Sequence, residues 1–408
     1  MSTDVAGESS ERRRNLTGPQ GTGDSVRGVR VVVAPDSFGG TLSARAAAGA
    51  IAEGWSRAVP DARIDRLPLA DGGTGFVDVL QERLGGTLHE PQVTGPFGDP
   101  VTAPWLQVGT TAYIESAAAC GLHHVPRERR TPEVAGRVTT RGVGELLRAA
   151  RAAGCTEAVI GLGGSATTDG GSGMLAALGA APLDASGAEL PPGGADLARC
   201  VRLSGTPDVG MTLVAAADVD NPLLGPHGAA AVFGPQKGAD EATVAALDAA
   251  LAAWAGVLAG ATGRDVRDEP AAGAAGGLGA ALLALGARRE SGAGLVRRLL
   301  GLDEALDAVA AEGGLAITGE GSFDWQSLRG KLITAVAGAA AERGVPCVVL
   351  AGQVSVGRRE AAAAGVDAAY SASEHAGGVE ASMADPAGTL AALAEHVAHR
   401  WGGSPASR

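Results

Sequence analysis

The chain has 408 residues, of which 45% are hydrophobic and 19% charged, so it can bury a sizeable core in two or three domains. Aromatic residues make up only 3% and the formal net charge is -12, which argues against a protein that binds nucleic acid. The four cysteines lack metal-ligand spacing, and the N-terminus lacks an apolar signal segment, so we expect a reduced, cytoplasmic protein. No apolar run reaches the roughly 18 uncharged residues of a membrane span, so we expect no membrane partner.

The first predicted elements are a strand, a turn and a helix. Residues 1–27 are polar and aperiodic, which predicts a disordered tail, and a second tail is expected at 401–408. Residues 29–34 are an apolar, β-branched run typical of a strand buried on both faces. A turn follows, and residues 42–58 predict a helix with Thr41 or Ser43 as its N-cap.

The same pattern recurs along the chain. Short apolar runs end in small or acidic residues and lead into helix-like stretches at 158–162, 212–217, 315–318 and 347–351. This alternation predicts an α/β fold with parallel strands and functional loops at their carboxyl ends. Residues 82–115 differ, because their Thr, Val and Pro content and turn signals favour an antiparallel or mixed sheet.

The glycine-rich stretch 161–173 is the most informative motif. Gly163 and Gly164 let backbone amides converge on an anion near a helix N-terminus, and Ser165 adds a hydroxyl donor. Asp169 could bind Mg²⁺ or accept a substrate proton. The other interpretation is a tight turn with a capping aspartate. A P-loop is not supported, because no Gly-Lys-Ser/Thr follows.

Two further loops could contact phosphate or metal. Lys237 stands between the turn formers of residues 234–238 and could neutralise a phosphate, unless it is a solvated lysine on a surface turn. Asp218, Asp220 and Asn221 follow a predicted strand. Their oxygens suit Mg²⁺, although the same residue types also initiate turns for local reasons.

Several other loops place a carboxylate beside glycine or another small residue. They contain Asp36 with Ser37, Asp71 with Gly72 and Gly73, Glu115, and Glu320. Any one of them alone reads as a cap or turn, but together at strand ends they would form an acidic cleft suited to metal-assisted phosphoryl transfer. A glycosidase is disfavoured by the scarcity of aromatic residues, and a serine hydrolase by the lack of a Gly-x-Ser-x-Gly motif with a histidine partner.

In this order the motifs resemble the bacterial glycerate kinase family of glyoxylate and galactarate catabolism. The similarity is collinear from about residue 29 to about 395 and is most specific in GGSATTDGG and DVDNP…GPQKGA. The resemblance implies a discontinuous flavodoxin-like parallel-sheet domain and an inserted mixed α/β domain similar to restriction-enzyme-like folds. We place the first at 28–81 plus 286–400 and the second at 82–285.

The resemblance also implies the reaction and the site. It implies ATP- and Mg²⁺-dependent phosphorylation of glycerate by a monomer or homodimer, with 2-phosphoglycerate favoured over 3-phosphoglycerate. A kinase for another small hydroxy acid and a catalytically weakened metabolite-binding member stay open as alternatives. The implied catalytic acids are Asp169 and Asp36, with Asp218 and Glu320 nearer the metal. The implied substrate or phosphate contacts are Ser37, Asp71, Gly72, Gly73, Glu115, Gly163, Gly164, Ser165, Lys237, Gln326 and Lys331.

Two positions depart from the family pattern. Gly39 stands where members commonly carry Lys, and Ser322 where they commonly carry Arg. Both changes remove a positive charge from loops expected at the cleft, which should weaken binding of an anionic acid or shift the preferred acceptor. Arg141, Arg329 or Lys331 could compensate.

Overall fold

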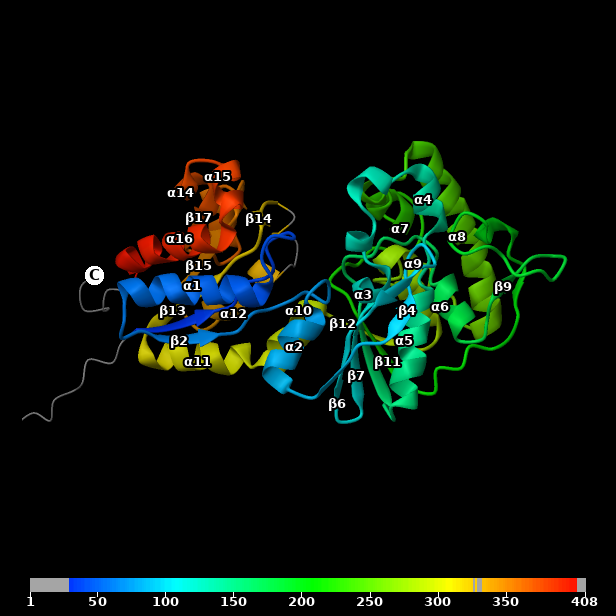
Figure 1. The fold of residues 1–408 in the computed structure, drawn as a ribbon, viewed down its shortest axis with the longest axis horizontal. Helices are drawn as coiled ribbons and strands as arrows, with labels where there is room; N and C mark the ends of the chain where they lie inside the picture. Colours follow the sequence, from blue (N-terminus) through cyan, green and yellow to red (C-terminus); the bar gives the residue numbers. More distant parts are fainter. Residues whose placement is uncertain (1–28, 326, 329–331, 402–408) are drawn as a thin grey trace, which may run out of the picture.

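The computed structural model describes residues 29–325, 327–328 and 332–401 (Figure 1). The predicted tail over 1–27 therefore lies outside the described residues, as does all but the first residue of the predicted tail over 401–408. Gln326 and Lys331 lie outside them too.

A five-stranded parallel sheet contains the first strand of the chain. Its order is β17-β15-β13-β1-β2, so β1 pairs with strands from the C-terminal third, as expected for a discontinuous flavodoxin-like unit. The chain passes from β1 to β2 on one side and β13 lies on the other, which makes the edge between β1 and β13 the topological switch point. The strands are β1 (Arg30–Val33), β2 (Arg63–Arg66), β13 (Gly314–Thr318), β15 (Cys347–Ala351) and β17 (Ala368–Ser371).

Helices cover both faces of this parallel sheet. On one face Ile51, Trp55 and Leu390 pack with alternate residues of β1, and on the other Leu306 and Val336 pack with Val32. The predicted first helix is confirmed and begins after Ser43, whose hydroxyl accepts a hydrogen bond of 3.1 Å from the amide of Ala46. The covering helices are α1 (Ala44–Ala58), α11 (Leu302–Glu312), α12 (Leu332–Ala341) and α16 (Pro386–Trp401).

A second, six-stranded sheet is mixed. Strands β7, β8, β11 and β12 run parallel, whereas β6 and β3 pair antiparallel at one edge, so the mixed sheet predicted over 82–115 is confirmed. A hairpin of β4 and β5 lies in the same segment. The strands are β3 (Thr87–His89), β4 (Gln92–Thr94), β5 (Pro100–Thr102), β6 (Trp105–Val108), β7 (Thr111–Glu115), β8 (Glu157–Gly161), β11 (Thr212–Ala216) and β12 (Arg288–Glu290).

One face of the mixed sheet carries a thick helical layer. Helix α8 (Glu241–Thr262) is apolar and long enough to cross a membrane by length and composition alone, but one of its faces packs through Leu251, Trp254 and Leu258 into the core of this layer. The other helices of this part are α3 (Ser116–Cys120), α4 (Pro132–Arg137), α5 (Arg141–Ala152), α6 (Ser172–Ala177), α7 (Ala229–Phe233) and α9 (Ala274–Ala284).

Short elements complete the fold. The short strands are β9 (Pro182–Leu183), β10 (Arg202–Leu203), β14 (Ser322–Phe323) and β16 (Gln353–Val354). The 3₁₀ helices are η1 (Leu122–His124), η2 (Arg127–Arg129), η3 (Leu197–Arg199) and η4 (Pro235–Lys237). Three short helices, α13 (Arg358–Ala363), α14 (Ala372–Ala376) and α15 (Val379–Ala384), lie near the C-terminus.

Two helices lie between the sheets (Figure 1). They are α2 (Phe76–Leu84) and α10 (Gly292–Leu300), and their buried faces join one hydrophobic cluster with residues of both sheets. The mixed sheet contributes Tyr113, Val159 and Val214, and the parallel sheet contributes Val32 and Ala316. The apolar core is therefore continuous from one sheet to the other.

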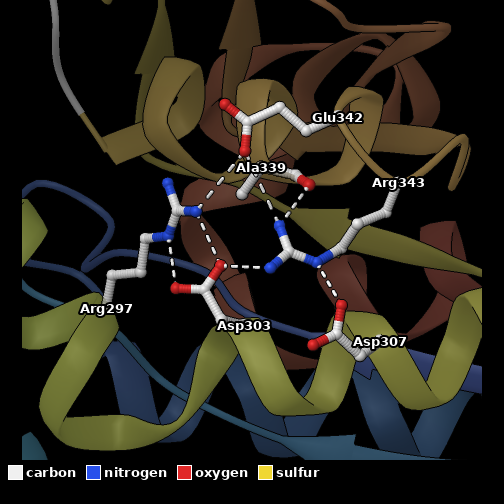
Figure 2. Close-up of polar contacts among 6 residues, drawn as sticks. All are labelled: Arg297, Asp303, Asp307, Ala339, Glu342 and Arg343. Carbon is white, nitrogen blue, oxygen red and sulfur yellow. Dashed lines mark hydrogen bonds and ion pairs between the residues drawn. The ribbon is translucent and has the colours of Figure 1, made fainter.

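An ion-pair network holds α10 against the parallel-sheet helices. Figure 2 shows Asp303 between two guanidinium groups: it pairs with Arg297 of α10 at 2.6 Å and with Arg343 at 2.8 Å. Arg343 also pairs with Asp307 at 2.6 Å. The hydrogen bond from Arg297, followed by the charges of both guanidinium groups, lowers the pKa of Asp303. Asp303 and the two arginines are partly buried, whereas Asp307 is 64% exposed, so the two pairs of Asp303 are the ones that fix α10 to α11 and to the end of α12.

Candidate active site

Three carboxylates meet at the switch point of the parallel sheet. Asp36 follows β1, Glu320 follows β13, and Asp71 lies in the loop after β2. The amide of Asp36 donates to the carbonyl of Gly319 at 2.8 Å, which joins the first two loops. Burial, then the nearby carboxylate of Asp71 and more weakly that of Glu320, raises the pKa of Asp36 to about 7. The structure thus gathers acids that the sequence placed in separate loops.

The loop after β2 also touches the glycine-rich loop that follows β8. The amide of Gly163 donates to the carbonyl of Gly72 at 3.3 Å. A Cβ atom on Gly161 would lie 2.2 Å from the Gly72 oxygen, and one on Gly163 would lie 2.6 Å from Cα of Gly73. Glycine is therefore required here by the close approach of two backbones. This contact brings the strand ends of the two sheets together.

Two predicted site acids accept hydrogen bonds from the N-terminal ends of α2 and α10, the two helices between the sheets. Glu115 is buried at the end of β7 and accepts a hydrogen bond of 2.9 Å from the amide of Gly75, just before α2. Burial raises its pKa to about 7. Asp218 accepts from the hydroxyl of Ser291 at 2.6 Å and from the amide of Ala293 at 2.9 Å, at the start of α10. Burial is also the main cause that raises the pKa of Asp218.

Asp169 has no exposed surface. Its carboxylate accepts from the amide and hydroxyl of Thr140 at 2.8 and 2.9 Å, and from the amides of Gly171 and Gly173 at 3.1 and 3.3 Å. Burial raises its pKa, against the effect of these bonds. This side chain, one of the two predicted catalytic acids, therefore faces the interior and bonds its own loop to the backbone segment of Thr140.

Lys237 lies in the same buried region and is only 3% exposed. Its ammonium group donates to the carbonyl of Thr167 at 2.6 Å and to the hydroxyl of Ser165 at 3.3 Å. Burial lowers the pKa of Lys237 to about 8. The structure thus brings Lys237 and Ser165 together, as a support behind Gly163 and Gly164 and not as an open surface.

A cavity of about 450 Å³ opens at the carboxyl ends of β1, β13 and β15. Its inner end is formed by Ser37 and Glu320, and its outer wall by residues of α14, α15 and α16. Gly39 and Ser322, the two departures from the family pattern, both line it. Sequence reasoning missed the wall that includes Ser373, Ser382, Val379 and Met383, because the polar, glycine-containing stretch 371–386 carries no motif.

Among residues 29–325, 327–328 and 332–401, no group of three or more His, Cys, Asp or Glu side chains is arranged to hold a metal ion by itself. The charge of Asp71 nevertheless acts on two neighbouring acids, since it raises the pKa values of both Asp36 and Asp218. Asp71 therefore lies within electrostatic reach of acids from both sheets.

The parallel sheet, its acidic switch point and the adjoining cavity define an α/β protein whose ligand site lies at the carboxyl ends of the strands. Residues 31–402 match the model of the glycerate kinase family, and the chain belongs to that family. The chain is thus an enzyme of the phosphotransferase class.

Several relatives are similar over nearly their whole length. A Bacillus subtilis glycerate kinase is 44% identical and an Escherichia coli glycerate 2-kinase is 43% identical, and each comparison covers 84% of this chain and 90% of the relative. An uncharacterized Mycobacterium tuberculosis protein is 46% identical over 97% of this chain and 98% of its own. The crystal structure of a Salmonella typhimurium LT2 protein assigned as glycerate kinase 2 superposes with a TM-score of 0.74 at 38% identity, covering 91% of this chain and 98% of that one.

Proposed function

We propose that this enzyme transfers the γ-phosphoryl group of ATP to glycerate and forms 2-phosphoglycerate in the cytoplasm. The observation that carries the proposal is the meeting of Asp36, Asp71 and Glu320 at the switch point, beside a cavity, in a member of the glycerate kinase family. The name of the Escherichia coli relative supports the 2-hydroxyl as the acceptor.

The acids at the switch point fit a magnesium ion. Mg²⁺ prefers hard oxygen ligands and usually takes one or two carboxylates, with the rest from water and phosphate, so a complete protein cage is not required. Asp71 and Glu320 would hold it. Asp218 was predicted nearer the metal, but its bonds to Ser291 and Ala293 favour a role in positioning α10 beside Asp71. The bound ion would neutralise charge on the phosphate oxygens.

Asp36 is the residue we assign to the acceptor hydroxyl. It adjoins Ser37 at the inner end of the cavity, whereas Asp169 has no exposed surface. In the transfer, the bond between the γ-phosphorus and the β,γ-bridging oxygen breaks and a bond from phosphorus to the glycerate oxygen forms. The hydroxyl proton passes to the Asp36 carboxylate, and ADP leaves.

The glycine-rich loop forms the opposite side of the site. Gly164 is exposed and adopts φ +71°, so its backbone can approach a ligand closely. We assign Gly163, Gly164, Gly72 and Gly73 to contact with the transferred group. Lys237 and Asp169 act as positioning residues that hold this loop from behind, through the hydroxyl of Ser165 and the amides after Asp169.

A different small hydroxy acid is the second candidate acceptor. The observation that favours it is that Gly39 and Ser322 line one cavity, so both expected cations are lost from the same place. An anionic acid would be bound less strongly there. The binding of a less charged hydroxy acid would be weakened less by the loss of these cations.

The test is a coupled assay of ADP release with glycerate and a panel of other hydroxy acids. Proton-coupled ³¹P spectra of the glycerate product identify the hydroxyl, because a phosphate on C2 couples to one proton and a phosphate on C3 to two. ADP release that requires glycerate, with a doublet in the product, supports the proposal. Faster turnover of another acid would transfer the proposal to that acid, and no turnover would favour a metabolite-binding member.

A further inference from the structure

The cavity extends away from the acids at the switch point. Its inner end, at Ser37 and Glu320, adjoins the proposed site of phosphoryl transfer. Its outer end runs between the loop after β1 and the helices α15 and α16. In open parallel sheets, ligands bind in the crevice at a switch point. A volume of about 450 Å³ lies within the usual range for small-molecule sites.

The outer wall of the cavity is apolar and partly open to solvent. In the described part of the chain, five large hydrophobic side chains are exposed, and two of them, Val379 at 49% and Met383 at 54%, line this cavity. A third, Trp325 at 58%, lies beside the lining residue Asp324. Two exposed apolar side chains on the wall of one cavity suit contact with the apolar part of a ligand. Methionine and aromatic side chains accept flat ring systems well.

The polar lining is uncharged or acidic in the described residues. Hydroxyl and amide groups come from Ser37, Thr41, Gln353, Ser373 and Ser382, and negative charge comes from Glu320 and Asp324. Carboxylates repel a bare phosphate chain but accept hydrogen bonds from hydroxyl groups. The lining therefore suits a neutral group with a flat ring and hydroxyls.

From this placement we propose that the cavity binds the nucleoside of the phosphoryl donor. The base lies against Val379 and Met383, the ribose hydroxyls face the polar lining, and the phosphates extend past Ser37 toward the acids at the switch point. The proposal rests on the proposed function, because it takes the donor to be a nucleoside triphosphate. It adds where the donor enters and which helices recognise it, and it leaves glycerate on the side of the glycine-rich loop.

The test places a negative charge on the outer wall. Val379→Glu and Met383→Glu change exposed side chains, so folding should be preserved. Val201→Glu is the matched control, because Val201 is 55% exposed and lies beside β10, away from the cavity lining. Binding of ADP and of adenosine to each protein is measured by titration calorimetry without acceptor, and melting temperatures are compared.

We expect wild type to bind adenosine, and both wall variants to bind ADP at least about tenfold more weakly while Val201→Glu is unchanged, since a charge opposes burial of the base. In steady-state assays the wall variants should raise KM for ATP and leave KM for glycerate unaltered. Unchanged ADP affinity in both folded wall variants would overturn the proposal, as would a rise in KM for glycerate alone.

The two proposals fail separately. If ADP and adenosine bind and the wall variants lose them, the nucleoside assignment stands even when glycerate is not phosphorylated. If glycerate is phosphorylated while adenosine does not bind and the wall variants behave as wild type, the kinase assignment stands and the nucleoside assignment falls.

Discussion

The carboxylate of Glu115, at the end of β7, accepts a hydrogen bond of 2.9 Å from the amide of Gly75, forty residues earlier in the chain. This bond fixes the start of α2 and with it the loop that carries Asp71, Gly72 and Gly73. A negative charge at a helix N-terminus is favourable, but burial opposes the charge more strongly here and raises the pKa of Glu115 to about 7. The bond thus stabilises the loop, while the charge costs stability at neutral pH.

Glu115→Gln should increase stability at neutral pH. The folded-state pKa is about 7 against an ordinary 4.5, so the folded protein binds this proton more tightly than the unfolded chain. Its contribution is therefore fully present below pH 4.5 and is lost as pH rises to 7, by on the order of 3 kcal/mol. Glutamine keeps an acceptor for Gly75 without the charge. Urea unfolding between pH 4.5 and 7.5 should show a smaller loss of stability in the variant than in wild type, whereas Glu90→Gln, at an exposed position, should match wild type.

Asp36→Asn should abolish most turnover without harming the fold. Loss of the proton acceptor should lower kcat by about 100-fold or more. Melting temperature should stay equal or rise, because a buried charge beside Asp71 and Glu320 is removed. Single-turnover kinetics and calorimetry measure the two effects, with Asp61→Asn, at an exposed position, as the control. Ordinary kcat in the variant would remove Asp36 from the reaction.

Asp169→Asn should lower the stability of the fold, unlike Asp36→Asn, which should lower turnover. Its amide group would place N–H donors against the amide and hydroxyl of Thr140 or the amides of Gly171 and Gly173, where the carboxylate only accepts. We expect a loss of about 1–3 kcal/mol in the free energy of unfolding, measured with urea. Unchanged stability together with a large fall in kcat would instead support the catalytic role that the sequence indicated.

Gly39→Lys combined with Ser322→Arg tests which ligand the lost cations would have met: if the acid acceptor reaches this cavity, KM for glycerate should fall by about tenfold, whereas a cavity that holds only the donor nucleoside predicts an unchanged KM for glycerate and a changed KM for ATP. A Cβ atom on Gly39 would meet nothing within 4 Å, so the lysine has room. Residue 39 adopts φ +49°, a left-handed conformation that costs other residues about 1–2 kcal/mol. Gly39→Ala with Ser322→Ala therefore controls for strain. If wild type already has an ordinary KM for glycerate and the charged pair gains nothing, the other parts of the site supply the charge.

Much of the parallel framework could be predicted from local sequence. All five predicted apolar runs form strands: 29–34, 158–162, 212–217, 315–318 and 347–351. A short β-branched or apolar run bounded by glycine or acidic residues is buried most readily as a central strand of a parallel sheet. The edge strands β2 and β17 escaped prediction. Arg63–Arg66 carries charges on its exposed side, and the first three residues of Ala368–Ser371 are only partly buried, so neither strand has the apolar run that marks a central strand.

The candidate site was harder to predict, because an acid that caps a backbone turn and an acid that meets a substrate look alike in sequence. Asp36 and Asp169 both follow a strand and precede small residues, yet one adjoins a cavity and the other is completely buried. Tertiary packing makes that difference: the segment 271–277 covers Asp169's loop, with the amide of Gly170 bonded to the carbonyl of Gly276 at 3.0 Å. This covering contact comes from residues about a hundred positions after Asp169, so local sequence does not reveal it.

The continuous core around α2 and α10 has a consequence for how the chain folds and moves. Separating the inserted segment, residues 82–285, from the rest of the chain would expose Leu106, Tyr113, Val159 and Val214 to water. An isolated segment with this apolar face in water would be less stable than the same segment in the whole chain. The whole described chain should instead unfold in one cooperative transition. For the same reason, a wide hinge opening between the sheets would expose the apolar contacts around α2 and α10 to water. It would also be opposed by the ion pairs of Asp303, which attach α10 to the helices of the parallel sheet. We therefore expect closure on substrate to involve the loops at the strand ends more than the two sheets.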